Sequence, residues 1–179
     1  MTEVQSAEQL EAPVTIGPEA YISRDYARAE RDRLWRKSWL QAGRLEDMPQ
    51  DGDFITFDIH DDSIIVVREN AETLRAFHNV CVHRGRKLID TPKGARNARG
   101  NRKNFVCGFH GWTYNLQGKC TYIQHRDDWQ GSLTDESTSL GLVKCETWGG
   151  WVWINMEPDS VSLAEWLGVV PDMLGPYQL

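Results

Sequence analysis

The sequence predicts a mainly β protein: an antiparallel sandwich or small barrel with a two-loop subdomain, preceded by an N-terminal helix. Short apolar or alternating runs recur from Gly52 onward, with turn residues between them. A serine that can cap a helix stands before these runs. The 179 residues are 40% hydrophobic and include 8 Trp, 5 Tyr and 5 Phe, which is enough to bury a core without disulfides.

The first quarter of the chain holds the expected helix. Residues 1–20 mix Glu, Gln, Pro and Gly without periodicity and are expected to form a flexible N-terminal arm. In region 21–44, Ser23 can cap a helix that runs over about 24–40, with an apolar face that becomes stronger toward its tryptophans. Gly43 is expected to stop this helix.

The strand patterns fill region 45–158. The expected strands are 54–59, 64–67, 73–77, 104–107, 112–114, 142–148 and 151–155. Many short strands joined by turns are typical of an antiparallel sandwich or barrel. After them, Ser162–Leu167 resembles the start of a short helix, which Pro171 is expected to close.

Charge and hydropathy exclude several classes of partner. Acidic residues outnumber basic residues by 26 to 20, so nucleic acid and anionic membranes are disfavoured as partners. The longest apolar runs are far too short to span a bilayer, and residues 1–14 lack the apolar core of a secretory signal. The expected location is the cytoplasm, where four cysteines are better explained as metal ligands or buried thiols than as disulfides.

Two short motifs contain the residues with the clearest chemistry. Cys81-Val82-His83-Arg84-Gly85 and Cys107-Gly108-Phe109-His110-Gly111-Trp112 each contain one cysteine and one histidine. Each motif lies where a predicted strand ends and a glycine-bearing loop begins. Two such loops can converge and offer two thiolates and two imidazoles to one site.

The arrangement of these ligands distinguishes between metals. A structural zinc site of two Cys and two His usually has both cysteines in one loop and both histidines in another. Here each loop has one ligand of each kind, which matches a cluster with two Cys on one iron and two His on the other. The glycines at 85, 108 and 111 would let the backbone turn sharply and approach an inorganic core.

The two motifs, with the following Gly-Trp-Thr-Tyr-Asn-Leu-Gln-Gly at 111–118, resemble the Rieske [2Fe–2S] domain of ring-hydroxylating oxygenase large (alpha) subunits. The resemblance runs from about Tyr21 to Pro158 and includes 75–79, before the first loop, and 149–155, near its end. It implies that Cys81 and Cys107 bind the inner iron, and that His83 and His110 bind the outer iron.

Neighbours of the ligands are expected to tune or flank the cluster. The resemblance places Tyr114 where a phenol can donate to a cysteine sulfur, and it places Arg84 and Gly85 beside a ligand. Arg84 has two open interpretations, an anchor for a partner's carboxylate and a simple surface residue. Trp112 stands where respiratory Rieske domains have a serine that donates to the cluster, and both loops lack the extra cysteines of those domains. We therefore expect a potential toward the low end of about −150 to +300 mV.

Segment 91–104, between the two motifs, is longer than is usual for the family and contains no acidic residue. Its basic residues are Lys93, Arg96, Arg99, Arg102 and Lys103. One interpretation is a solvated insertion. The other is a docking patch for an acidic ferredoxin or reductase near the cluster.

The resemblance implies that a ferredoxin or flavin reductase reduces the cluster. The electron then passes to a mononuclear non-haem Fe(II) in a catalytic domain, typically of a neighbouring subunit in a homo- or hetero-oligomer. Only His60, His78 and His125 remain to bind such an iron, and none forms a ligating pattern with a carboxylate. The oxygen-activating site is therefore expected outside this chain, with 159–179 as the connection toward it.

Two other classes stay open at this stage. One is a freestanding Rieske-type ferredoxin, which carries electrons without an oxygenase domain. The other is a zinc-stabilised interaction module. Cys120 and Cys145 lie outside both motifs and are expected to be small buried hydrophobic residues rather than ligands.

Overall fold

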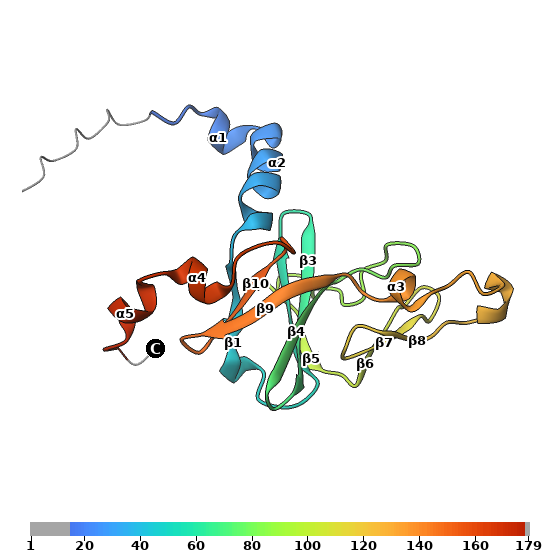
Figure 1. Ribbon diagram of the computed structural model, residues 1–179. Coiled ribbons are helices and arrows are strands. Elements are labelled where there is room, and N and C mark those ends of the chain that lie inside the picture. The colour runs from blue at the N-terminus through green and yellow to red at the C-terminus, as the bar shows by residue number, and fades with distance from the viewer. Residues whose placement is uncertain (1–14, 178–179) are drawn as a thin grey trace, which may run out of the picture.

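The computed structural model describes residues 15–177, which form two antiparallel sheets with short helices at both ends of the chain (Figure 1). The larger sheet has seven strands in the order β1-β10-β9-β4-β3-β2-β5, and the smaller sheet has three in the order β6-β7-β8. The prediction of a mainly antiparallel β fold is confirmed.

The strands of both sheets are short. Those of the larger sheet are β1 (Leu40–Arg44), β2 (Asp53–Ile59), β3 (Asp62–Asn70), β4 (Thr73–His78), β5 (Arg99–Asn101), β9 (Leu142–Trp148) and β10 (Trp151–Asn155). Those of the smaller sheet are β6 (Asn104–Val106), β7 (Thr113–Asn115) and β8 (Cys120–Tyr122). All seven predicted strands are present, while β1, β5 and β8 were not predicted.

The N-terminal helix is shorter than the sequence predicts. The backbone N–H of Tyr26 donates to the side chain of Ser23, which caps α2 (Arg24–Arg33) as expected. The helix ends at Arg33, and a 3₁₀ turn follows. The expectation of a helix to residue 40 is wrong, because Leu40–Arg44 is strand β1, paired with β10. Cross-strand pairing at the sheet edge outweighs the helical spacing of the preceding apolar residues.

The expectation for the first twenty residues is answered only in part. Residues 1–14 lie outside the described residues. Glu19 and Ala20 belong to a short helix, α1 (Glu19–Ile22), rather than to an irregular arm. In Figure 1, α1 and α2 project away from the sheets.

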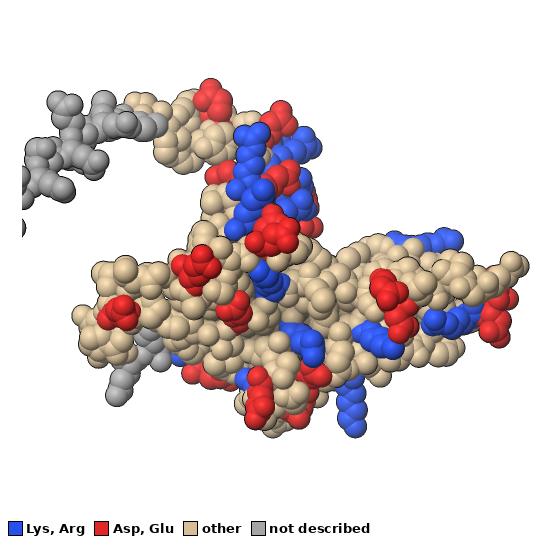
Figure 2. Space-filling view, in the orientation of Figure 1, with Lys and Arg blue, Asp and Glu red and all other residues tan. Residues whose placement is uncertain are grey.

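Ion pairs join α2 and the turn after it to the β2–β3 hairpin. The Arg36 guanidinium donates to both carboxylate oxygens of Asp62, each at 2.8 Å, and Arg31 pairs with Asp61 at 2.8 Å. Figure 2 shows the corresponding mixture of basic and acidic side chains over α2.

Strand β3 explains how one sheet serves two cores. Its central run alternates between faces, so Ile65 and Val67 belong to one buried cluster while Ile64 and Val66 belong to the other. The first cluster also includes Phe105 and Tyr114 from the smaller sheet. The smaller sheet is therefore packed against one face of the larger one. The first Cys-His motif follows β4, and the second connects β6 to β7.

The C-terminal residues form two short helices. The Ser162 side chain accepts from the Glu165 N–H and caps α4 (Leu163–Leu167), in agreement with the prediction. Pro171 does not close this helix. Instead, it lies in the first turn of α5 (Val170–Leu174), where its missing N–H costs nothing.

Four further short helical segments lie within the described residues. They are the 3₁₀ turns Trp35–Lys37, Leu45–Asp47 and Arg126–Trp129; one turn of α-helix, α3 (Asp135–Thr138), follows the last of them. Across residues 15–177, every helix falls short of the length and apolar character needed to cross a membrane.

Candidate metal centre

The two motifs form loops with the same backbone hydrogen bonds. In the first loop, the Cys81 N–H donates to the Arg86 carbonyl at 2.8 Å. In the second loop, the Cys107 N–H donates to the Trp112 carbonyl, also at 2.8 Å. Both bonds span five residues, so the sequence folds into two matching loops whose first residue is a cysteine.

A left-handed glycine closes each loop at the same position. Gly85, four residues after Cys81, has a φ of +68° and donates to the Cys81 carbonyl at 2.9 Å. Gly111, four residues after Cys107, has a φ of +71° and donates to the Cys107 carbonyl at 3.0 Å. Apart from each glycine and its two chain neighbours, no heavy atom of the described residues lies within 4 Å of a Cβ placed on Gly85, Gly108 or Gly111. The loops therefore border open space, as an inorganic core would require.

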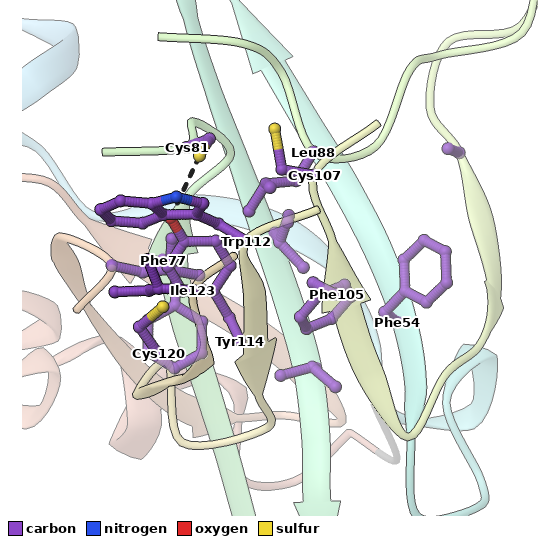
Figure 3. Packing of buried hydrophobic residues seen from close by; sticks show 14 residues of the cluster. Phe54, Phe77, Cys81, Leu88, Phe105, Cys107, Trp112, Tyr114, Cys120 and Ile123 are labelled. Carbon is purple, nitrogen blue, oxygen red and sulfur yellow. Dashed lines mark hydrogen bonds between the residues drawn. The ribbon is translucent and has the colours of Figure 1, made fainter. Parts of the chain in front are cut away.

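The two sulfurs lie on the buried side of the site. Cys81 is 1% exposed and Cys107 is 3% exposed, and Figure 3 shows both sulfurs at the same end of the buried cluster. The Tyr114 hydroxyl lies 3.1 Å from the Cys81 Sγ (dashed line in Figure 3). Burial raises the pKa of Tyr114, so the phenol keeps its proton and can donate it to a thiolate.

The protonation of Cys81 depends on what it binds. Burial raises the pKa of the Cys81 thiol, and the hydrogen bond with Tyr114 works in the opposite direction. Because a bound metal cation replaces the thiol proton, this buried sulfur is suited to being a metal ligand rather than a free nucleophile.

The two imidazoles lie on the outer side. His83 and His110 are half-buried, and their ring centroids are 4.7 Å apart. Burial, the neighbouring His110 and Arg84 together lower the pKa of His83. This favours the neutral imidazole, which is the form that binds a metal.

Aromatic side chains surround these imidazoles. Trp112 stacks on His83 with centroids 4.8 Å apart and an interplanar angle of 3°, and Phe109 covers His110 at 3.8 Å. Trp129 meets His83 edge-on at 5.8 Å. The imidazoles therefore reach the surface through a collar of aromatic rings.

These residues fit a two-iron cluster. The Nδ1 atom of His110 is buried and has no hydrogen-bond partner in the described chain, which is the situation expected of a metal-ligating nitrogen. Within residues 15–177, no three His, Cys, Asp or Glu side chains gather around one ion position. A two-iron core takes two ligands at each end, which matches two cysteines on the buried side and two histidines on the outer side.

The structure also places the remaining candidate residues. Arg84 is exposed beside His83 and forms no ion pair within the described residues. Cys120 is buried and donates to the Tyr122 carbonyl at 3.5 Å. Burial raises the pKa of Cys145 to about 12, so this thiol stays protonated. His78 packs on the other side of β4's end, against Gly141.

Asn79 is a positioning residue that the sequence reasoning missed. It is 2% exposed and lies two residues before Cys81. Its side-chain oxygen accepts from the N–H groups of Leu88 and Ile89 at 3.1 and 2.9 Å, and its amide donates to the Ile89 carbonyl at 2.8 Å. One side chain thus ties the end of β4 to the far end of the first loop. A polar residue between two apolar runs was the only available signal.

The basic segment 91–104 is partly ordered against the sheet. Strand β5 pairs with β2, and Arg99 forms an ion pair with Asp47 at 2.6 Å. The side chains of Lys93, Arg96, Arg102 and Lys103 are exposed and form no ion pair within residues 15–177. A plain solvated loop therefore describes only part of this segment.

Together, the fold and the site define a β domain in which two matching loops present two buried sulfurs and two outer imidazoles to a diiron cluster. The chain matches the model of the Rieske [2Fe–2S] domain over residues 38–139, and it belongs to that family. The resemblance drawn from the motifs is confirmed, as is the [2Fe–2S] cofactor, and the family match rules against a zinc module.

The relatives are oxygenase subunits. The chain is 32% identical over 158 residues to the alpha subunit of the methanesulfonate monooxygenase hydroxylase from Methylosulfonomonas methylovora. This match covers 86% of this chain and 38% of the relative. It is 29% identical over 153 residues to the alpha subunit of benzene 1,2-dioxygenase from Pseudomonas putida, with 86% of this chain and 33% of the relative covered.

A solved structure of a quaternary ammonium Rieske monooxygenase superposes with a TM-score of 0.79 at 27% identity. The match covers 90% of this chain and 45% of that one. The chain thus spans less than half the length of these relatives.

Proposed function

We propose that Cys81 and Cys107 bind the inner iron of a Rieske cluster and that His83 and His110 bind the outer iron. The observation that carries this is the pair of matching loops, which buries both sulfurs and leaves both imidazoles half-buried with centroids 4.7 Å apart. When bound, the cluster supplies one-electron transfer. Gly85 and Gly111 give the loops their shape, Tyr114 donates to the Cys81 sulfur, and Trp112 packs on His83.

The arrangement implies a direction for the electron. Both sulfurs face the core, so the half-buried imidazoles are the shortest link between the cluster and another protein. A donor or acceptor is therefore expected to dock at the His83 and His110 side, where Arg84 is free to pair with its carboxylates.

The proposed role is that of the electron-transfer domain of a Rieske non-haem iron oxygenase in the cytoplasm. A ferredoxin or flavin reductase supplies electrons, and a mononuclear iron in a catalytic domain receives them. That domain belongs to the same subunit or to a neighbouring subunit of a homo- or hetero-oligomer. Segment 159–179, with α4 and α5, is the proposed connection toward it, following the Rieske domain proposed for residues 45–158.

Hydroxylation of an aromatic ring is the proposed reaction class of the whole oxygenase. The names of the relatives point to benzene, methanesulfonate and quaternary ammonium compounds, although all match this chain over the same region. The residues that choose the substrate are therefore expected outside this domain. Comparing products from the complete oxygenase with benzene, methanesulfonate and a quaternary ammonium compound would decide between the classes.

Reconstitution tests the ligand assignment. Anaerobic loading with iron and sulfide should give a coloured protein with the rhombic paramagnetic signal of a reduced Rieske centre. His83→Ala and His110→Ala should abolish that signal, whereas His60→Ala, which changes an exposed histidine outside the loops, should preserve it. Wild-type protein that stays colourless, or a His83→Ala variant that keeps the signal, would refute the assignment.

The low reduction potential is a second measurable consequence. Trp112 has no hydroxyl to donate to the cluster, so we propose a midpoint toward the low end of about −150 to +300 mV. A strongly positive midpoint in a redox titration would contradict this.

The basic segment 91–104 is the proposed contact for an acidic electron donor. Neutralising Lys93, Arg96 and Lys103 together should slow reduction by the donor at low ionic strength and have little effect at high ionic strength. Equal slowing at every salt concentration would count against docking.

A further inference from the structure

We propose that Trp129 caps the ligand His83 against water, and that it thereby lowers the reduction potential of the cluster. This inference rests on the proposed ligand assignment and adds to it a residue that lies 46 positions further along the chain. Trp129 belongs to neither motif. It comes from a 3₁₀ turn, Arg126–Trp129, in the connection between β8 and β9.

Two indole rings form a corner around one side of His83. Trp112 lies flat on the imidazole, with an interplanar angle of 3°. Trp129 stands nearly perpendicular to both rings, at 76° to His83 and 74° to Trp112, with centroid distances of 5.8 and 6.0 Å. The stacked indole thus covers one face of the imidazole, and the perpendicular indole covers an adjoining edge.

The backbone of the turn is shaped to place this indole. His125 and Gln130 flank the turn, and both adopt the left-handed conformation, with φ of +54° and +51°. Two left-handed residues other than glycine so close together are uncommon and persist where their surroundings hold them. The N–H and hydroxyl of Ser132 both donate to the Trp129 carbonyl, at 3.0 and 2.7 Å.

Trp129 joins the turn to the proposed metal centre. Residues 124–132 are all exposed, and Trp129 is 37% exposed. Its ring contacts are with His83 and Trp112. Its indole therefore attaches the turn to the site, while Arg126 of the same turn donates to the Leu133 carbonyl at 3.4 Å.

The expected electrical effect follows from charge balance. Two ferric ions balance two sulfides and two thiolates, so the oxidised centre is neutral. Accepting one electron leaves it with a net negative charge, and water stabilises that charged form more than the neutral one. A side chain that excludes water from an outer ligand therefore makes reduction less favourable. Removing it should raise the midpoint potential.

The experiment compares reconstituted variants in a spectroscopic redox titration. Trp129→Ala should raise the midpoint, and Trp129→Phe should raise it less, since a smaller ring leaves part of the edge covered. Trp166→Ala removes an equally large, 49% exposed tryptophan from α4 and should leave the midpoint unchanged. Pulsed paramagnetic resonance in deuterated water should detect more exchangeable deuterons near the centre in Trp129→Ala.

The outcomes distinguish two roles of Trp129: excluding water from His83, and only holding the turn in place. A purely structural role would change the mobility of the turn but would leave the midpoint and deuteron signal of Trp129→Ala at wild-type values, and this result would overturn the proposal. If Trp129→Ala fails to hold the centre, the decision falls to Trp129→Phe. A rise supports the cap, and no rise overturns it. Failure of the wild type to form the centre would instead refute the ligand assignment.

Discussion

Replacing Tyr114 by Phe should lower the reduction potential of the cluster. The Tyr114 hydroxyl lies 3.1 Å from the Cys81 Sγ, and both residues are almost completely buried, at 0% and 1% exposure. A donated hydrogen bond stabilises negative charge on the sulfur, and that charge is greater after reduction. Phe retains the ring that packs in the buried cluster and removes only the donor, so the fold should be preserved.

The size of the shift follows from the strength of this bond. Hydrogen bonds to charged groups contribute about 1.5–3 kcal/mol, and only the part that differs between the two oxidation states affects the midpoint. If that part is about 1 kcal/mol, the one-electron midpoint falls by about 40 mV, since a tenfold change in equilibrium corresponds to about 59 mV and about 1.4 kcal/mol.

A spectroscopic redox titration of the reconstituted protein measures this shift. Tyr122→Phe is the matched control, because Tyr122 is 56% exposed and forms no hydrogen bond through its hydroxyl in the described chain. Its midpoint should equal that of the wild type. An unchanged or higher midpoint in Tyr114→Phe, with the cluster intact, would show that the phenol does not donate to the sulfur.

Three further predictions concern stability. Burial opposes ionisation of Asp58, but the hydrogen bonds that its carboxylate accepts outweigh this effect and lower its pKa. The ionised carboxylate therefore stabilises the fold above about pH 4, and this stabilisation is lost as the pH falls through the lowered pKa. In thermal melts, the Asp58→Asn variant should therefore lose less stability on acidification than the wild type. Asn79→Ala should reduce the free energy of unfolding in urea by about 2–4 kcal/mol, because buried backbone groups of the first loop lose their partners; a loss below about 1 kcal/mol would contradict this. Gly118→Ala should reduce the free energy of unfolding by at least about 2 kcal/mol, because Gly118 has a φ of +79° and an added Cβ would overlap a buried phenylalanine ring. The control Gly94→Ala, at a φ of +83° with open space around it, should cost only the backbone strain.

The central strands could be predicted because their pattern comes from the packing itself. β3 contacts a core on each face, so its continuous apolar run identifies it as a strand from the sequence alone, without knowledge of the strands beside it. β5, by contrast, consists of Arg99, Gly100 and Asn101, all exposed. Nothing in its composition marks a strand, and it forms because β2 offers an unpaired edge. The composition of β1 does not mark a strand either, and its pairing with β10 is interrupted by an irregularity between Gln41 and Gly43.

The proposed ligands could be identified in the sequence for a different reason. Each Cys-His pair lies within a loop of six residues, so its spacing alone restricts its geometry. The residues that support the loops do not share this property. Asn79 acts through bonds to residues nine and ten positions later, and Trp129 contacts His83 from 46 positions further along the chain. Such contacts depend on the fold, and a single sequence without a structure shows only an asparagine and a tryptophan.

The two groups of supporting residues act on the cluster in opposite directions. On the buried side, Tyr114 offers a proton to a sulfur and favours the reduced state. On the outer side, Trp112 and Trp129 replace water around His83 and favour the oxidised state. The first acts on a proposed inner ligand, and the second acts on a proposed outer ligand. The outer side is also where a partner must approach, so a docked protein that displaces more water there would lower the potential further. Docking would then make the reduced cluster a stronger electron donor on the side where the electron leaves.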